Sequence, residues 1–233
     1  MISSIVDPIA DRSFFCSWSG GKDSCLALYH ALQRGGKPAC LFTMLSEDNQ
    51  TSRSHGLPKP ILQQQARQLG LPIVFRSASW GDYEATFLTM LHDFKAQGVE
   101  IGVFGDIDIE EHRDWCQRVC AVSGLRAYHP LWKRPRRELL QELIDLKFKA
   151  VIVVTHADKL GSEWLGKTID AQTIQELENA GVDPSGERGE YHTVVTHGPL
   201  LRSEITLNTR NPLLHDGYWF LPVLANQPDP DDE

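Results

Sequence analysis

The sequence has few cysteines, and they form no pattern that a known cysteine site uses. There are five among 233 residues, an odd number, and no two stand as Cys-x-x-Cys. This excludes the disulfide framework of a small secreted domain and the ligand spacing of a zinc ribbon. Cys116 and Cys120 lie four residues apart and would share one face of a helix. They could bind a metal or a redox partner, but free cysteines are often buried, so we favour core residues.

A long apolar run and a basic amino-terminal segment are also missing. No window approaches 18 uninterrupted apolar residues, so we expect no membrane span. Residues 1–11 lack the features of a signal peptide, and a cytoplasmic location is expected. The formal net charge is −8, whereas a broad nucleic-acid-binding surface needs a basic excess. The charge therefore argues against such a surface, although a local basic patch stays open.

Strand-like and helix-like patterns alternate through the first half of the chain. The patterns predict strands at 14–18, 39–45, 72–76 and 101–105, and helices at 24–34, 58–69, 83–97 and 110–123. This alternation is typical of βαβ units and of a parallel sheet with flanking helices. We therefore expect residues 1–130 to form an α/β domain.

The pattern changes near residue 130. It predicts helices at 138–146 and 169–179, a β-branched strand at 150–155 that is buried on both faces, and strands at 192–196 and 204–207. We interpret residues 131–225 as a smaller α+β region that packs closely on the first domain. The Pro- and Asp-rich segment 226–233 is expected to be disordered.

A glycine turn, Ser19-Gly20-Gly21-Lys22-Asp23-Ser24, stands between the first predicted strand and helix. Backbone N–H groups at such a turn point to one spot beside the positive end of the helix dipole, where phosphate groups bind. Lys22 would add a positive charge, and Ser19 and Ser24 would add hydroxyl donors. A turn that merely connects strand and helix would not need these polar residues. The spacing matches neither a Walker A loop nor Gly-x-Gly-x-x-Gly.

Two further segments are expected at the same edge of the sheet, because ligands bind at the carboxyl ends of parallel strands. Gly105-Asp106-Ile107-Asp108 ends the fourth predicted strand, and the polar loop 46–56 follows the second. Asp106 and Asp108 could hold Mg²⁺ bound to a nucleotide, and a turn-forming role is the alternative. We favour a functional role for Asp106 because of its position.

The segment 183–193 is rich in ionisable side chains just before a predicted strand. Glu187 and Glu190 could bind Mg²⁺, orient an amine or act as a base, and His192 could shuttle a proton. A plain polar turn would explain the spacing equally well. The basic cluster Trp132-Lys133-Arg134-Pro135-Arg136-Arg137 could grip phosphate groups or an acidic partner, or simply begin a solvated helix.

Together these residues resemble the diphthine–ammonia ligase family of ATP pyrophosphatases. The resemblance covers roughly residues 14–202, and the glycine turn alone would indicate only the superfamily. The order Gly-Glu-Tyr-His-Thr after it is far more specific. The similar pieces are Ser19-Gly20-Gly21-Lys22-Asp23-Ser24-Cys25, Gly105-Asp106-Ile107, His112-Arg113-x-Trp115-Cys116, Pro130-Leu131-Trp132, Phe148-Lys149-Ala150, Leu165-Gly166-Lys167, Asp170, Gly181-Val182-Asp183-Pro184, Gly189-Glu190-Tyr191-His192-Thr193 and Gly198-Pro199-Leu200.

The resemblance implies an HUP-like fold and an amide-forming ligase that uses ATP and Mg²⁺. ATP would adenylate a carboxylate, and ammonia would displace AMP. In the family, the carboxylate belongs to diphthine, a modified histidine of elongation factor 2. Bacterial relatives exist although bacteria lack that modification, so a different carboxylate is also open.

Carried onto this sequence, the resemblance assigns three groups of residues. The catalytic group is Lys22, Asp23, Glu190 and His192. The ATP-binding group is Ser19, Gly20, Gly21, Lys22, Asp23, Ser24, Gly105 and Asp106, with Asp106 also as the metal ligand. The acceptor-binding group is His55, Glu187, Arg188, Gly189, Glu190, Tyr191 and Thr193.

Two departures from the family pattern fall in the expected acceptor site. Ser185 stands where the family commonly has Cys, and Arg188 stands where it has Asn. Of the loop 52–55, only His55 matches. The use of ATP is thus better supported than the identity of diphthine as the acceptor substrate. The alternatives are an enzyme of the same superfamily that adenylates an RNA base or a small carboxylate, and a non-catalytic ATP- or AMP-binding protein.

Overall fold

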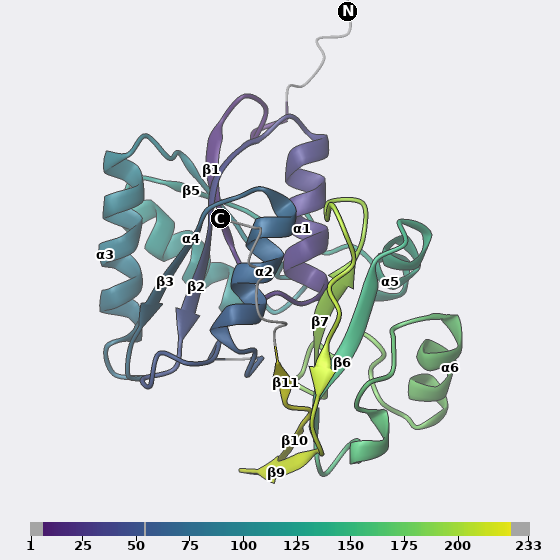
Figure 1. Cartoon of the computed structure of the whole chain (residues 1–233). Helices are drawn as coiled ribbons and strands as arrows, with labels where there is room; N and C mark the ends of the chain where they lie inside the picture. The colour runs from purple at the N-terminus through teal and green to yellow at the C-terminus, as the bar shows by residue number, and fades with distance from the viewer. Residues whose placement is uncertain (1–6, 54, 225–233) are drawn as a thin grey trace, which may run out of the picture.

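The computed structural model describes residues 7–53 and 55–224. The first part contains β1 (Ser13–Ser17), α1 (Lys22–Gln33), β2 (Lys37–Leu45), α2 (Lys59–Leu69), β3 (Ile73–Ser77), α3 (Tyr83–Ala96), β4 (Ile101–Val103), α4 (Glu110–Val122) and β5 (Arg126–Tyr128). Its strands form a parallel sheet in the order β3-β2-β1-β4-β5 (Figure 1). This confirms the predicted α/β architecture, which is Rossmann- or HUP-like.

One strand of this sheet was missing from the sequence prediction. β5 is only three residues long, Arg-Ala-Tyr, and offers no apolar run from which a strand could be recognised. It pairs with β4, with Val103 opposite Tyr128. Pairing with a neighbour, rather than intrinsic propensity, accounts for so short an edge strand. Its end places His129 at the same edge of the sheet as Asp106.

Helices cover both faces of the parallel sheet, and adjacent residues of β1 face opposite ways. Phe15 belongs to the same apolar cluster as Phe87 of α3 and Val119 of α4. Phe14 belongs to the cluster that contains Leu26 of α1. Figure 1 shows α3 and α4 on one side of the sheet and α1 and α2 on the other. With both faces covered, the strand ends are the part of the sheet left for a ligand.

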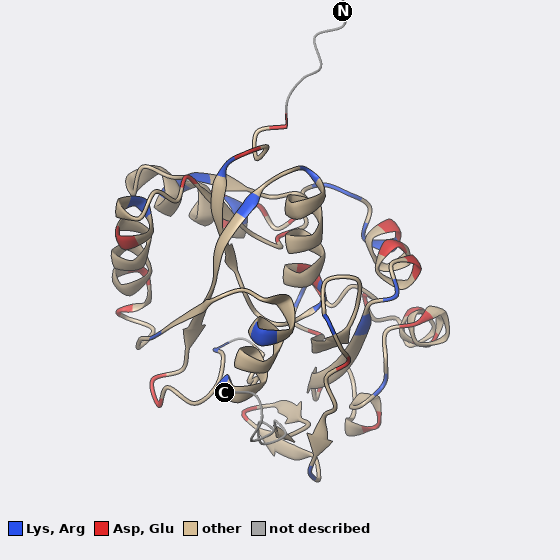
Figure 2. Ribbon diagram, turned by 45° about the horizontal axis from the view of Figure 1, so that its top comes forward, with Lys and Arg blue, Asp and Glu red and all other residues tan. Residues whose placement is uncertain are grey.

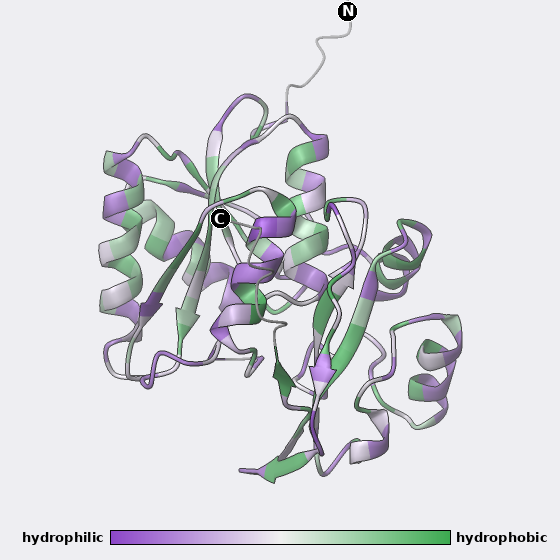
Figure 3. Ribbon diagram, in the orientation of Figure 1, coloured by the Kyte–Doolittle hydropathy of each residue, from purple (hydrophilic) through white to green (hydrophobic). Residues whose placement is uncertain are grey.

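The second part is an α+β unit, as predicted, and its strands pair antiparallel. It contains α5 (Arg136–Asp145), β6 (Lys149–His156), a 3₁₀ turn (Ser162–Trp164), α6 (Ala171–Asn179), β7 (Tyr191–His197), β8 (Asn208–Thr209), β9 (Leu213–His215), β10 (Tyr218–Phe220) and β11 (Val223–Leu224). One sheet has the order β7-β6-β10-β9, and β11 pairs with β8. Residues 150–155 of β6 are all buried, as predicted, and Figure 3 colours the middle of this strand as hydrophobic.

The predicted strand at 204–207 is wrong. This described segment is irregular, although the N–H of Ile205 donates to the carbonyl oxygen of Thr196 at 2.8 Å. The alternation has another cause: Ile205 is buried in the core, while Glu204 pairs with Lys149 at the surface. The predicted disordered tail, 226–233, lies outside the described residues.

The basic cluster at 132–137 is accounted for by ion pairs within the chain. Arg136 contacts both carboxylate oxygens of Asp108, at 2.6 and 2.7 Å, and also contacts Asp183. The other cations pair as Lys133 with Glu110, Arg134 with Glu142 and Arg137 with Glu178. Figure 2 shows basic and acidic residues interspersed over both parts of the molecule. Among the described residues, no helix has the length and apolar character needed to cross a membrane.

Candidate functional site

A cavity of about 940 Å³ lies at the carboxyl edge of the parallel sheet. Its walls come from both parts of the chain: the glycine turn, the loop before α2, the start of α3, the segment after β4 and the loop before β7. The predicted site residues that line it are Ser19, Asp23, Ser24, His55, Gly105, Asp106, Glu187, Arg188, Gly189 and His192. Residues far apart in the sequence are thus brought to one cavity.

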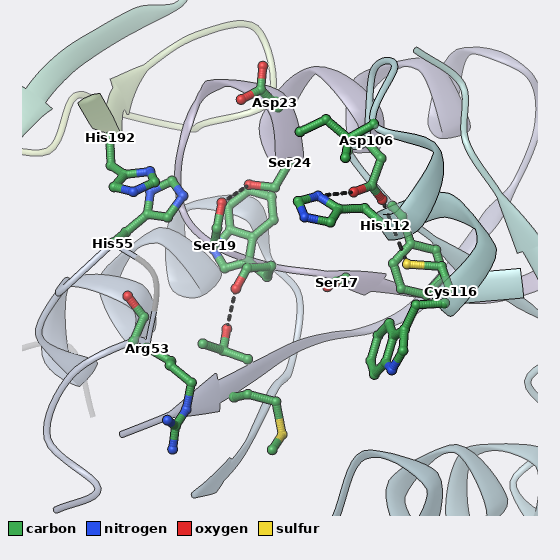
Figure 4. Close-up of a pocket in the computed structure, with 18 of the residues that line it drawn as sticks. Ser17, Ser19, Asp23, Ser24, Arg53, His55, Asp106, His112, Cys116 and His192 are labelled. Atoms are coloured by element: carbon green, nitrogen blue, oxygen red, sulfur yellow. Dashed lines mark hydrogen bonds and ion pairs between the residues drawn. The ribbon is translucent and has the colours of Figure 1, made fainter. Parts of the chain in front are cut away.

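The glycine turn forms an anion cradle at the start of α1. The hydroxyls of Ser19 and Ser24 lie 3.1 Å apart and are joined by a dashed line in Figure 4. Ser24 also donates to the carbonyl oxygen of Gly21 at 3.1 Å. Gly21 caps the helix without a side-chain hydrogen bond. The first-turn N–H groups of Asp23 and Ser24 have no carbonyl acceptor within their own helix. They are therefore suited to phosphate oxygens.

Two glycines are required for this geometry. Gly20 has φ +78°, and a Cβ there would lie 2.6 Å from the side-chain oxygen of Gln65. A Cβ on Gly105 would lie 2.9 Å from the carbonyl carbon of Asp23 and 3.0 Å from the amide nitrogen of Ser24. The end of β4 can therefore approach the start of α1 only because residue 105 has no side chain.

The second part of the chain holds the cradle in place. The carbonyl oxygen of Gly20 accepts from the N–H of Val195 at 2.9 Å and from the Gln65 amide at 2.9 Å. The same amide donates to the carbonyl oxygen of Val195 at 2.8 Å, while Trp18 donates to the Gln65 side-chain oxygen at 3.0 Å. The N–H of Lys22 donates to the hydroxyl of Thr193 at 3.1 Å. β7 is thus directly bonded to the turn.

Lys22 lies beside the cavity rather than in its wall. Its ammonium donates to the carboxylate of Asp23 at 2.7 Å and lies 5.5 Å from the ring centroid of Tyr191. Burial lowers the pKa of Lys22, but the charges of Asp23, Tyr191 and Glu187 and the hydrogen bond to Asp23 together outweigh burial and raise the pKa. The lysine therefore stays charged and reaches the cavity through Asp23.

Two histidines from different parts of the chain meet in the cavity. The ring centroids of His55 and His192 lie 4.6 Å apart (Figure 4), and His55 Nδ1 lies 3.0 Å from the carbonyl oxygen of Thr193. Burial lowers the pKa of His55, and burial together with the charges of His55 and Lys22 lowers the pKa of His192 well below its usual value. Both rings are therefore neutral at pH 7.

Glu187 and Arg188 place a carboxyl group and a cation in the cavity wall. Burial, followed by the charge of Asp23, raises the pKa of Glu187 to about 8. The backbone N–H of Arg188 donates to the carboxylate of Glu190 at 2.9 Å. In the described part of the chain, no ion pair or side-chain hydrogen bond engages the guanidinium of Arg188. It is free to contact an anionic ligand.

Several predicted residues do not line the cavity. Glu190 is buried, where its carboxylate accepts from Lys159 at 3.0 Å and fixes the Arg188 loop. Tyr191 is buried and donates to the carbonyl oxygen of Pro184 at 2.6 Å. Ser185, expected in the acceptor site, instead donates to Asp183 from a buried position. Like Gly20, Gly21, Lys22 and Thr193, these residues support the walls.

Asp106 and Asp108 have different surroundings. Asp108 is occupied by Arg136, so of the two only Asp106 lines the cavity. The carboxylate of Asp106 lies 3.7 Å from His112 Nδ1, 3.7 Å from the Cys116 sulfur and 3.5 Å from His129 Nε2. Figure 4 shows it between His112 and Cys116.

An aromatic wall of the cavity was not predicted from the sequence. The cavity is also lined by five aromatic residues and the exposed Trp80: Phe42, Tyr83, Phe87, Phe104 and Trp115. The guanidinium of Arg53 lies 4.4 Å from the Trp80 ring centroid. The position of Phe104 at the carboxyl end of β4 could have indicated it. Trp80 lies in the loop after β3, and Tyr83 begins α3.

Comparison with known proteins matches nearly the whole described chain. The family model for the diphthamide synthase N-terminal domain matches residues 14–127, and the model for the C-terminal domain matches residues 135–222. These two ranges contain the glycine turn and the segment 183–193, respectively.

Several relatives carry the same name, diphthine–ammonia ligase. The rat (Rattus norvegicus) protein is 27% identical over 88% of this chain and 86% of its own length. The human protein is 24% identical, again over 88% of this chain and 86% of its own length. The fission yeast (Schizosaccharomyces pombe) protein is 24% identical over 84% of this chain, but that match spans only 36% of the longer yeast protein.

Proposed function

The chain belongs to the diphthamide synthase family, and from this premise we propose that it is an AMP-forming ligase, which adenylates a carboxylate with ATP and converts it into an amide with ammonia. The observation that carries the proposal is the convergence of two segments on one cavity. The anion cradle at Ser19–Ser24 suits the phosphates of ATP, and the loop 186–192 faces it with a cation, a carboxylate and a neutral imidazole. A non-catalytic nucleotide-binding protein would not need the second set.

The two ends of the cavity suggest how ATP binds. The β- and γ-phosphates fit at the cradle, where the first-turn N–H groups of α1 and the serine hydroxyls donate hydrogen bonds. The adenosine fits along the aromatic wall, where Phe104 and Trp115 offer apolar contact. The α-phosphorus then lies between cradle and loop 186–192, within reach of an acceptor.

ATP brings Mg²⁺, which prefers oxygen ligands. Asp23 and Glu187 line the cavity, and repulsion by Asp23 is one reason for the raised pKa of Glu187. A cation between them would relieve that repulsion, so we assign Mg²⁺ to this pair, where it would neutralise charge on pyrophosphate. Asp106, the ligand predicted from the sequence, fits Mg²⁺ poorly because its neighbours are imidazoles and a thiol.

The proposed reaction has two steps. A carboxylate oxygen of the acceptor bonds to the α-phosphorus, and the bond from that phosphorus to the bridging oxygen breaks, so that pyrophosphate leaves with the electron pair. The nitrogen of ammonia then bonds to the acyl carbon, and AMP leaves with the electron pair of the carbon–oxygen bond. The neutral ring of His192 accepts the proton that the nitrogen loses.

Arg188 is the proposed contact of the acceptor. Arg188 lines the cavity, its guanidinium forms no ion pair among the described residues, and its planar fork matches a carboxylate. Diphthine on elongation factor 2 is the acceptor that the relatives' name suggests. The positive charge equally suits a smaller acidic molecule, so both belong in the test.

The amide product tests this proposal. We would incubate the full chain with ATP, Mg²⁺, ¹⁵N-ammonium and either diphthine-bearing elongation factor 2 or a panel of small carboxylates. We expect one acceptor to exchange a hydroxyl for a ¹⁵N-amide, and the variant Asp23→Asn to lose this activity. Adenylated RNA as the product, or an acceptor consumed without gaining ¹⁵N, would contradict the proposal.

A further inference from the structure

Three side chains of different chemistry meet at the floor of the cavity. Asp106 follows β4, Cys116 lies on α4 and His129 follows β5, and one ligand atom from each lies within 4.8 Å of the others. Asp106 and Cys116 line the cavity, whereas His129 approaches from behind and packs its ring on Phe104, with 5.4 Å between the ring centroids. The three residues offer an oxygen, a sulfur and a nitrogen.

The spacing of these atoms suits a tetrahedral metal ion. Zn²⁺ binds sulfur at about 2.3 Å and imidazole nitrogen or carboxylate oxygen at about 2.0–2.1 Å, so its ligand atoms stand roughly 3.3–3.6 Å apart. Here the Cys116 sulfur lies 3.7 Å and His129 Nε2 lies 3.5 Å from the same oxygen of Asp106. An ion could therefore bind with small side-chain movements.

His129 supplies an independent sign of a missing partner. Its side chain is 5% exposed, and its Nε2 atom is buried without a hydrogen-bond partner in the described structure. A buried polar atom without a hydrogen bond is unfavourable, and the carboxylate of Asp106, at 3.5 Å, is too far to form one of normal length. Nε2 points to the one place where Asp106 and Cys116 also converge, so a bound ion would satisfy all three groups.

We propose that Asp106, Cys116 and His129 form a binding site for a transition-metal ion of the Zn²⁺ class. The mixed nitrogen, sulfur and oxygen donors favour such an ion over Mg²⁺. Three protein ligands leave a fourth position, which faces the cavity, and the ring of His112 lies beside it with Nδ1 3.7 Å from Asp106. This site is independent of the proposed ligase activity and of the Mg²⁺ assigned to Asp23 and Glu187.

Cobalt binding tests the site without any need for turnover. The untagged, reduced full chain is titrated with Co²⁺, a coloured substitute for Zn²⁺. We expect about one equivalent to bind, with the intense visible bands of a tetrahedral ion and a thiolate-to-cobalt band in the near ultraviolet. Zn²⁺ should displace it and remove both signals.

Matched variants locate the ion. Cys116→Ser should abolish the thiolate band, and His129→Gln should weaken Co²⁺ binding at least about ten-fold. Cys120→Ser is the control, because Cys120 is buried one turn further along α4 and belongs to no donor cluster found among the described residues. It should bind as the wild type does.

A measurement on the unaltered protein keeps the test decisive if a variant fails to fold. X-ray absorption of the Zn²⁺-loaded wild type should show one sulfur at about 2.3 Å and nitrogen or oxygen ligands at about 2.0 Å. A shell of nitrogen and oxygen alone would overturn the proposal. So would the absence of stoichiometric binding, or a thiolate band that survives Cys116→Ser.

Discussion

Arg188 is the single residue to which we assign the acceptor specificity of the proposed ligase. Its neighbours in the loop are engaged: Glu190 holds Lys159 and the loop backbone, and Ser185 holds Asp183. The sequence already indicated Arg188 as a departure from the family pattern, because residue identity alone reveals a change of charge. It also indicated Ser185, but only the structure shows that this hydroxyl is buried away from the cavity.

Arg188→Asn restores the neutral amide of the family pattern and should weaken binding of an acidic acceptor. Loss of a charge-assisted hydrogen bond worth about 1.5–3 kcal/mol corresponds to roughly a 10- to 100-fold higher KM for that acceptor. The KM for ATP should change little. Steady-state kinetics with each substrate varied in turn makes this comparison, and an equal rise in both KM values would contradict the role given to Arg188.

Glu187→Gln should remove a pH-dependent loss of stability. Burial and the charge of Asp23 raise the pKa of this carboxyl from 4.5 to about 8. Between these values the unfolded chain has released the proton that the folded chain keeps, so the stability of the wild type falls as pH rises through this window. Because the glutamine side chain is neutral at every pH, the Glu187→Gln variant should lack this fall in stability.

Urea unfolding of both proteins between pH 4.5 and 9 measures that difference. The advantage of Glu187→Gln should grow with pH and level off above pH 8. Glu111→Gln is the matched control, since Glu111 also lines the cavity but is exposed to water, and its stability curve should parallel that of the wild type. A difference in unfolding free energy between Glu187→Gln and the wild type that is the same at every pH would contradict the raised pKa of Glu187.

At the scale of elements, the cradle depends on how β4 and α1 approach each other. The sequence predicted both elements, because apolar periodicity and glycine turns are local signals. It could not predict that Gly105 touches the backbone of Asp23, since a contact between residues 82 positions apart leaves no local pattern. The position of His129 beside Asp106 could not be predicted for a related reason. It depends on β5, which forms because it pairs with β4 and not because of its own strand propensity.

Gly105→Ala should displace the start of α1 and weaken ATP binding. The added Cβ would lie 2.9 Å from the carbonyl carbon of Asp23, where backbone must move. Because displacements near 1 Å can cost about 100-fold in an active site, we expect at least about a ten-fold loss of ATP affinity by calorimetry. In Gly81→Ala the Cβ would meet only the Ser79 hydroxyl at 3.7 Å, and affinity should be retained. Equal affinities in the two variants would refute the contact.

At the scale of the whole molecule, the two parts of the chain act as one unit. The main apolar cluster contains Leu26 and Trp18 from the first part and Tyr191 and Val195 from the second. Gln65 adds a polar junction, since its buried amide bonds to Gly20, Trp18 and Val195. The sequence predicted close packing from the lack of a linker, but a long-range junction through a glutamine has no sequence signature.

Gln65→Leu should destabilise the whole chain. It leaves the indole N–H of Trp18 and the carbonyl oxygen of Val195 without their buried partner. At about 1–3 kcal/mol for each unpaired group, the free energy of unfolding should fall by roughly 3 kcal/mol in urea denaturation. Gln63→Leu, on the same helix, should change it far less. A Gln65→Leu protein as stable as that control would show that the junction is unimportant.

The central claim is that this cavity cleaves ATP between the α- and β-phosphates. The most direct measurement is the fate of [α-³²P]ATP with the full chain, Mg²⁺, ammonium and the acceptors named above, separated by thin-layer chromatography. We predict that the label appears in AMP, and that this product is lost in Lys22→Ala, which removes the charge beside Asp23. Labelled ADP in place of AMP would contradict the account.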